Sequence, residues 1–220
     1  MINLISTAEA AIIILAFRRV LLLSRPKINF ILSAVCFLLL SFNLYKYLSS
    51  SLTLGYLRLP VEFSAVSYFL VPVIVLFKIP ALKSWAAYSA LLAGCGYFIS
   101  ALIFGDLIYA EYETQSIATA LLCHGALLFC GLLLISQERF SARSNWVLTA
   151  GLVFIGANAL LLKSRFGAGN GIFIYELLFA LRPIKLFGSG ILPIYYVILF
   201  TLVLVSLNTF YKVNQKLAKK

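Results

Sequence analysis

Charged side chains are scarce in this chain of 220 residues. They make up 11% of the residues, whereas hydrophobic residues make up 63%, and a typical soluble domain carries about 25% charged residues. A soluble fold cannot cover this much apolar surface, so a water-soluble globular protein, a disordered chain and a coiled coil are all excluded. The composition instead predicts an all-α, polytopic bundle of transmembrane helices.

Residues that bind metals or form disulfide scaffolds are also few. The chain has one histidine, seven acidic residues and four cysteines, and the cysteines lie in apolar runs without a CxxC pair. The sequence therefore predicts no metal site and no cofactor. The net charge of +11 comes from lysines and arginines at the ends of apolar runs. This placement predicts contact with membrane lipids through their anionic headgroups and no role in nucleic-acid binding.

Apolar runs predict a single integral membrane domain over residues 1–220 with about seven spans. The first run lacks the basic start and cleavage site of a signal peptide, so we expect it to form a span. Residues 172–181 are apolar but too short to cross a membrane, which predicts one short interfacial or re-entrant helix before the last span. The predicted spans are 4–23, 28–47, 60–77, 83–104, 114–135, 145–162 and 191–208.

Basic residues between the spans predict the orientation. With the N-terminus outside, twelve of the 18 lysines and arginines fall in inner segments and six in outer ones. Because cytoplasmic loops carry an excess of these residues, the count predicts an N-out, C-in protein. We expect a multi-pass protein of the cell membrane, in a bacterial inner or plasma membrane, whose basic cytoplasmic face contacts anionic headgroups.

Five polar side chains inside the predicted spans are candidates for function, because ionisable groups are costly there. They are Glu9, Glu62, Ser64, His124 and Asn158, and the predicted orientation places all five in the outer half of the bundle. Each also has a structural interpretation. Glu62 can satisfy free N–H groups at a helix start, Glu9 can face headgroups, Ser64 can bond to its own helix, and Asn158 can join two helices. His124 lies in mid-span and needs partners for both ring nitrogens, which favours a function.

The chemistry of this set points to acyl transfer. A histidine beside a hydroxyl forms a base–nucleophile pair, so Ser64 and His124 are the predicted reactive residues. A carboxylate such as Glu62 or Glu9 can hold the histidine tautomer, which is the third role in a catalytic triad. Asn158 is predicted to hold the acyl carbonyl. A proton relay through the two glutamates and the histidine is also chemically open.

Several motifs resemble a known family. They are LRLPVEFS at the start of the third predicted span, LLCHG in the fifth, Asn158 late in the sixth, GNGIFIYELLFALRP after it, and LPIYYVILF in the last. In order and spacing they are similar to the YwaF-like bacterial membrane proteins and transmembrane protein 164, and more distantly to the androgen-induced membrane hydrolases.

The resemblance implies a seven-helix acyltransferase or lipid-hydrolase scaffold. Carried onto this chain, it assigns the nucleophile to Ser64 and the base to His124, and it adds Asn170 to Asn158 and Glu9 as substrate-binding residues. Glu9 and Glu62 stand where many relatives have histidine, and Ser64 stands where some have a cysteine.

Three functions remain open at the level of the sequence. The first is a membrane-embedded acyltransferase or hydrolase acting on a lipid ester from the outer leaflet. The second is a non-enzymatic membrane subunit or scaffold whose polar cluster serves packing. The third is a small transporter that uses Glu9, Glu62 and His124 as a proton or ion path.

Overall fold

The prediction of an all-α fold is confirmed. The computed structural model describes residues 2–108, 113–141, 144–166 and 173–218, and in these ranges every regular element is a helix. The elements are α1 (Ile2–Val20), α2 (Arg25–Leu54), α3 (Phe63–Leu76), η1 (Pro80–Leu82), α4 (Lys83–Ile108), α5 (Thr114–Gln137), α6 (Ser144–Phe166), α7 (Phe173–Leu178), α8 (Leu181–Phe187), η2 (Ser189–Ile191) and α9 (Leu192–Leu217).

Five of these helices are long and apolar enough to cross a membrane, which is compatible with a multi-pass membrane protein. They cover Arg25–Leu54, Pro80–Gly105, Thr114–Gln137, Asn145–Lys163 and Ser189–Leu217. The two other predicted spans are also helical but differ from these. Helix α3 has only 14 residues and begins at Phe63 rather than Pro60, and α1 includes Glu9, Arg18 and Arg19.

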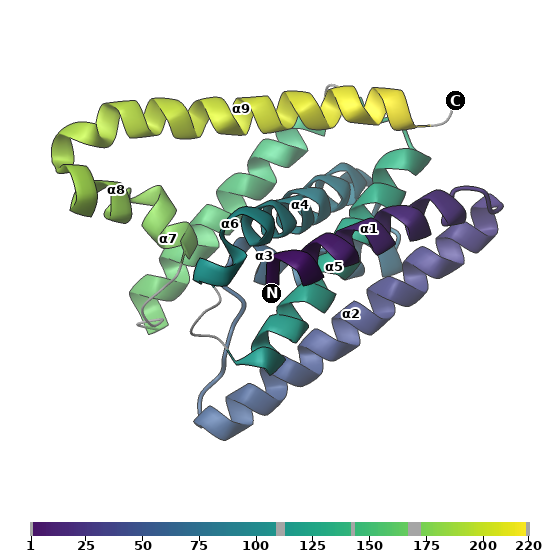
Figure 1. The fold of residues 1–220 in the computed structure, drawn as a ribbon, viewed down its shortest axis with the longest axis horizontal. Coiled ribbons are helices and arrows are strands. Elements are labelled where there is room, and N and C mark those ends of the chain that lie inside the picture. Colours follow the sequence, from purple (N-terminus) through teal and green to yellow (C-terminus); the bar gives the residue numbers. More distant parts are fainter. Residues whose placement is uncertain (1, 109–112, 142–143, 167–172, 219–220) are drawn as a thin grey trace.

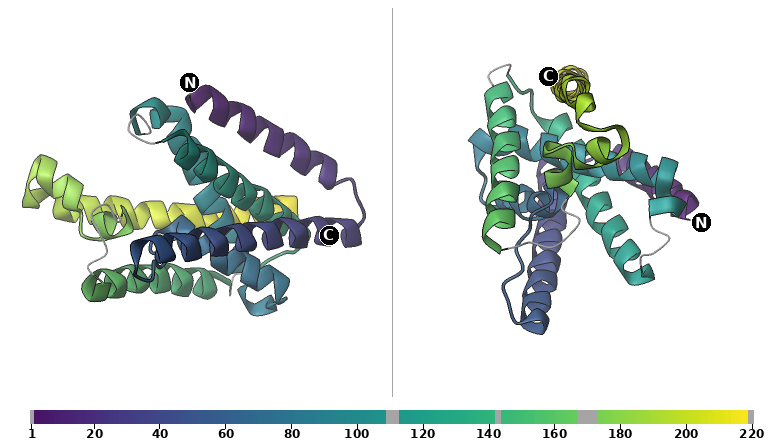
Figure 2. Two further views of the ribbon diagram at one scale, coloured as in Figure 1. Left: turned by 90° about the horizontal axis from the view of Figure 1, so that it is seen from below. Right: turned by 90° about the vertical axis from the view of Figure 1, so that its left-hand side faces the viewer.

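The inner helices are α3, α4 and α5. Helix α9 runs along one edge of the molecule and α2 along the opposite side, with α3, α4 and α5 between them (Figure 1). The same order is visible when α9 is viewed nearly end-on (Figure 2). The main hydrophobic core joins α2, α3, α4 and α5, and includes the fully buried Val71, Ala90, Leu127 and Leu133.

Glycines allow α4 and α5 to pack closely. A Cβ atom on Gly94 would lie 2.7 Å from the Cα of Leu128, and one on Gly131 would lie 2.8 Å from the backbone nitrogen of Leu91. No Cβ occupies such positions without a shift of the opposing backbone. Small residues at helix contacts are the usual means of close approach between membrane helices.

We expect Gly94→Ala to destabilise the fold by about 1–3 kcal/mol, the usual cost of overpacking. The measurement is thermal unfolding of the purified chain in detergent. Gly96→Ala is the matched control, because a Cβ at Gly96 meets nothing within 4 Å. Equal destabilisation by the two substitutions would contradict the role given to Gly94.

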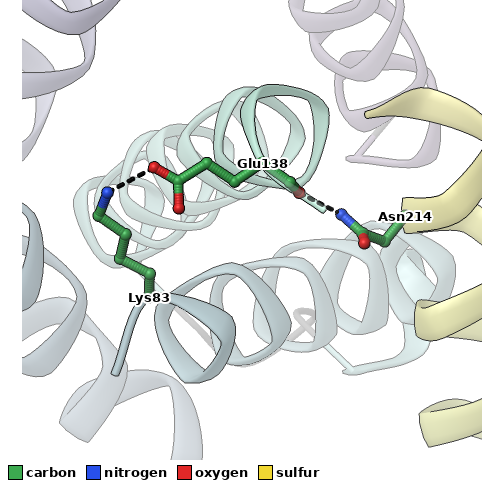
Figure 3. Close-up of polar contacts among 3 residues, drawn as sticks. All are labelled: Lys83, Glu138 and Asn214. Atoms are coloured by element: carbon green, nitrogen blue, oxygen red, sulfur yellow. Dashed lines mark hydrogen bonds and ion pairs between the residues drawn. The ribbon is translucent and has the colours of Figure 1, made fainter. Parts of the chain in front are cut away.

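The C-terminal end of α9 is fixed to the end of α5 by a buried asparagine. The Asn214 amide donates to the carbonyls of Ile135 (2.9 Å) and Glu138 (2.7 Å), and its oxygen accepts the N–H of Phe140 (2.8 Å). Figure 3 shows the Glu138 carbonyl bond together with the Glu138 carboxylate, which binds Lys83 at 2.5 Å. Carbonyls left free at the end of α5 are thereby satisfied by a side chain from another helix.

The apolar stretch before α9 forms two short helices. Helix α7 has six residues and α8 has seven, and Ala180 between them has a φ of 52°, in the left-handed region. A six-residue helix is about 9 Å long, which is far less than a bilayer core. Tyr195 and Tyr196 of α9 donate to the Leu177 and Leu178 carbonyls at the end of α7.

Candidate functional site

His124 lies near the middle of α5 and is held by two aromatic residues. Its ring stacks on Tyr97 of α4, with ring centroids 3.9 Å apart and an interplanar angle of 12°. The Tyr68 ring of α3 meets it edge to face at 5.4 Å. The Tyr68 hydroxyl is 2.9 Å from Nδ1 and 3.1 Å from Nε2 of the imidazole. The ring is therefore fixed from α3 and α4 at once.

The backbone selects the tautomer of His124. Its Nδ1 lies 2.8 Å from the carbonyl oxygen of Ala120, one turn earlier in α5. A carbonyl can only accept a hydrogen bond, so this contact places the proton on Nδ1. In that tautomer Nε2 is an acceptor and receives the hydroxyl proton of Tyr68. The Ala120 carbonyl thus fixes one nitrogen of the imidazole from within α5.

The structure places Ser64 beside Tyr68. Ser64 and Tyr68 are four residues apart, so they share one face of α3, and the Ser64 hydroxyl lies next to that of Tyr68. Within the described part of the chain no direct hydrogen bond joins Ser64 to His124. Tyr68 therefore stands between Ser64 and His124, bonded to the imidazole, and the reactive role of the Ser64–His124 pair stays a prediction.

The other predicted residues lie around these three residues. Glu9 of α1 approaches the neighbour of His124, because a Cβ on Gly125 would be 2.5 Å from a Glu9 carboxylate oxygen. Glu62 precedes α3 in extended conformation, and its carboxylate accepts the N–H of Ile174 in α7 at 3.3 Å. Asn158 of α6 donates to the Pro60 carbonyl at 3.3 Å.

These contacts bear on the predicted roles. Glu62 holds a helix start, as its structural interpretation proposed, although the helix is α7 rather than α3. Asn158 joins α6 to the segment before α3, which is the interhelical role. Their parts in orienting His124 and holding an acyl carbonyl stay predictions. Asn170 lies outside the described residues.

Sequence reasoning missed Tyr68, Tyr97 and three residues beside them. Asn43 of α2 is fully buried and lies 3.7 Å from the Cys123 sulfur. Lys46, one turn after Asn43, is within electrostatic range of Cys123 and His124. The spacing of Tyr68 from Ser64 was a usable signal. Tyr97, Asn43 and Lys46 come from helices distant in sequence and left no local pattern, whereas Cys123 directly precedes His124.

The arrangement places a serine hydroxyl, a phenol and an imidazole in series, with a hydrogen bond between the phenol and the imidazole. Among the described residues, no three His, Cys, Asp or Glu side chains gather as a metal-binding set. The chain matches no family model, no curated protein and no solved structure.

Proposed function

We propose that the protein is a membrane-embedded lipid acyltransferase or ester hydrolase with Ser64 as nucleophile and His124 as general base. The observation that supports this most strongly is the hydrogen bond between Tyr68 and His124, with the Ser64 hydroxyl next to Tyr68 on the same face of α3. A serine is a weak nucleophile unless a base takes its proton. The resemblance of LRLPVEFS and LLCHG to the YwaF-like proteins supports the same two residues.

The proposed reaction begins with a double proton shift. Ser64 passes its proton to the Tyr68 oxygen while Tyr68 passes its own to Nε2 of His124, so Tyr68 ends neutral. The Ser64 oxygen forms a bond to the ester carbonyl carbon, and the alcohol of the lipid leaves with a proton returned from the imidazolium. The Ala120 carbonyl, bonded to Nδ1–H, stabilises the charged ring.

The second half of the reaction releases the acyl group. An acceptor alcohol gives acyl transfer, and water gives hydrolysis, with His124 again taking the proton of the attacking group through Tyr68. Asn158, Glu9 and Asn170 are proposed to contact the substrate, and Glu62 to orient His124. With the N-out, C-in orientation and about seven spans, the substrate is a lipid of the outer leaflet.

A serine-reactive fluorophosphonate probe tests the nucleophile without knowledge of the substrate. We expect the probe to modify Ser64 in membrane vesicles and labelling to disappear in Ser64→Ala, because only an activated serine reacts. Ser67→Ala is the matched control and should label like wild type. Ser67 lies on the same helix and bonds to the Phe63 carbonyl at 2.7 Å.

Lipid profiles of cells provide the second arm of the test. Cells with wild type and with His124→Ala should differ in one class of acyl lipid. If the wild-type protein does not label at Ser64 and the lipid profiles are unchanged, the acyl-transfer proposal is wrong and the scaffold function is favoured.

A further inference from the structure

A groove on the outer side of α6 combines an apolar floor with one cation. Its volume is about 550 Å³, which is within the range of small-molecule sites, about 300–1,000 Å³. We call it the α6–α7 groove. It is lined by Ala157, Leu160, Leu161, Lys163, Tyr175 and Phe179.

The groove faces away from Ser64, Tyr68 and His124. Ile155 and Ala159 on the opposite face of α6 are buried in the bundle, whereas Ala157 and Leu161 are exposed. The side chain of Asn158 also turns inward, to the Pro60 carbonyl. The groove is therefore a separate feature, and its occupancy does not depend on the chemistry at Ser64.

Lys163 lies at the end of the apolar part of α6. The apolar segment covers Asn145–Lys163, so Lys163 is placed where a span meets the headgroups. Ala157 is six residues earlier, about 9 Å deeper at the rise of an α-helix. The groove thus runs from a cation at the headgroup level down an apolar helix face.

Two aromatic residues line the end of the groove that holds Lys163. The Lys163 ammonium lies 3.9 Å from the centroid of the Tyr175 ring, and the Phe179 ring is 4.6 Å from that of Tyr175. The ring contact holds the ammonium in place and leaves N–H donors for an anion, because an ammonium has three. Among the described lining residues Lys163 carries the one charge.

From this combination we infer that the α6–α7 groove is a binding site for an anionic glycerophospholipid. Lys163 contacts the phosphate, and an acyl chain lies along Ala157, Leu160 and Leu161. Lysine binds phosphate as a point charge, and basic pockets between membrane helices bind anionic headgroups. The positive charge of Lys163 excludes a cationic ligand. The apolar floor of the groove suits the acyl chain of a lipid rather than free phosphate.

Native mass spectrometry of the full chain in detergent tests this site with two probes. These are phosphatidylglycerol and phosphatidylcholine with identical acyl chains. Wild type should bind phosphatidylglycerol more tightly, and Lys163→Gln should weaken that binding about fivefold while leaving phosphatidylcholine unchanged. Lys163→Arg should retain the preference. Ala157→Phe, at an exposed position, should fill the groove and weaken both lipids.

Lys185→Gln is the matched control for charge, since Lys185 on α8 is exposed and is not a lining residue. Any of these lipid-binding results would overturn the inference: an equal loss in Lys185→Gln, no preference of wild type for phosphatidylglycerol, or unchanged lipid binding in Ala157→Phe. A dimer that Ala157→Phe abolishes would show that a second copy of the chain occupies the groove, and it would equally overturn the inference.

Discussion

Tyr68→Phe is expected to slow fluorophosphonate labelling of Ser64 by about 100-fold or more, although it removes a single oxygen atom. That oxygen bonds to the His124 imidazole and lies next to the Ser64 hydroxyl, so it is the proposed link between the two. General-base assistance contributes about 10²–10⁴-fold to a reaction, and without the phenol the base has no bonded path to the serine. The ring itself remains, so the edge-to-face contact with His124 is preserved. The measurement is the rate of labelling in vesicles at fixed probe concentration.

A double substitution tests whether Tyr68 and His124 act together as one proton relay or contribute independently to the reactivity of Ser64. If Tyr68 acts only by connecting Ser64 to His124, then Tyr68→Phe with His124→Gln should label no more slowly than His124→Gln alone, because residues that act as a unit are not additive. Tyr47→Phe is the control for loss of a phenol, since Tyr47 is in α2 and its ring packs on Phe69. Labelling that persists at the wild-type rate in Tyr68→Phe would remove Tyr68 from the mechanism.

The positions of the helices could be read from the sequence because apolar runs and helices coincide in most of this chain. Helices α4 and α5 begin at Lys83 and Thr114, as predicted. Helix α9 continues beyond the predicted end at residue 208 to Leu217, and α2 continues beyond the predicted end at residue 47 to Leu54. The polar residues there end the apolar run without ending the helix, because the Ser51 and Thr53 hydroxyls bond to carbonyls one turn earlier.

The end of α2 is set by glycine instead. Gly55 has a φ of 71°, in the left-handed region that glycine adopts without penalty. Helix α3 begins at Phe63 rather than at the predicted Pro60. The Pro60 carbonyl and the Glu62 carboxylate are held by Asn158 and Ile174, from α6 and α7. These contacts join the segment before α3 to helices distant in sequence, and no local pattern reveals them.

The sequence could predict the candidate site only at residues whose burial in a membrane span is costly. His124 drew attention because an imidazole in mid-span needs partners, and the structure supplies them. The identity of those partners depends on how closely α3 and α4 approach α5. Tyr97 stacks on His124 because α4 packs tightly on α5 at Gly94 and Gly131. A tyrosine is common at membrane helix ends, so its type alone indicated no such role.

Asn214→Leu is expected to destabilise the fold by about 2–4 kcal/mol, the largest effect on stability that we predict. The substitution removes three hydrogen bonds and leaves the carbonyls of Ile135 and Glu138 and the N–H of Phe140 without their partner. A polar group stranded in a buried place costs about 1–3 kcal/mol, and membrane measurements place each interhelical bond at about 0.6–1.7 kcal/mol. Unfolding in detergent measures the total.

The ion pair between Lys83 and Glu138 is expected to contribute much less to stability than Asn214. Asn214 binds the backbone carbonyl of Glu138, whereas Lys83 binds its carboxylate (Figure 3). Because the Lys83 and Glu138 side chains are 33% and 48% exposed, Glu138→Gln should cost less than about 1 kcal/mol. Asn208→Leu, at an exposed asparagine of the same helix as Asn214, should change stability by about 0.5 kcal/mol or less.

Hydrogen exchange locates the effect of Asn214→Leu. The Phe140 amide donates to the Asn214 oxygen, so its exchange should accelerate in this variant while amides near His124 in the middle of α5 keep their protection. Acceleration throughout α5 would mean that the end of α9 supports the whole helix. An unchanged Phe140 amide together with unchanged stability would show that the Asn214 contacts do not hold α9 to α5.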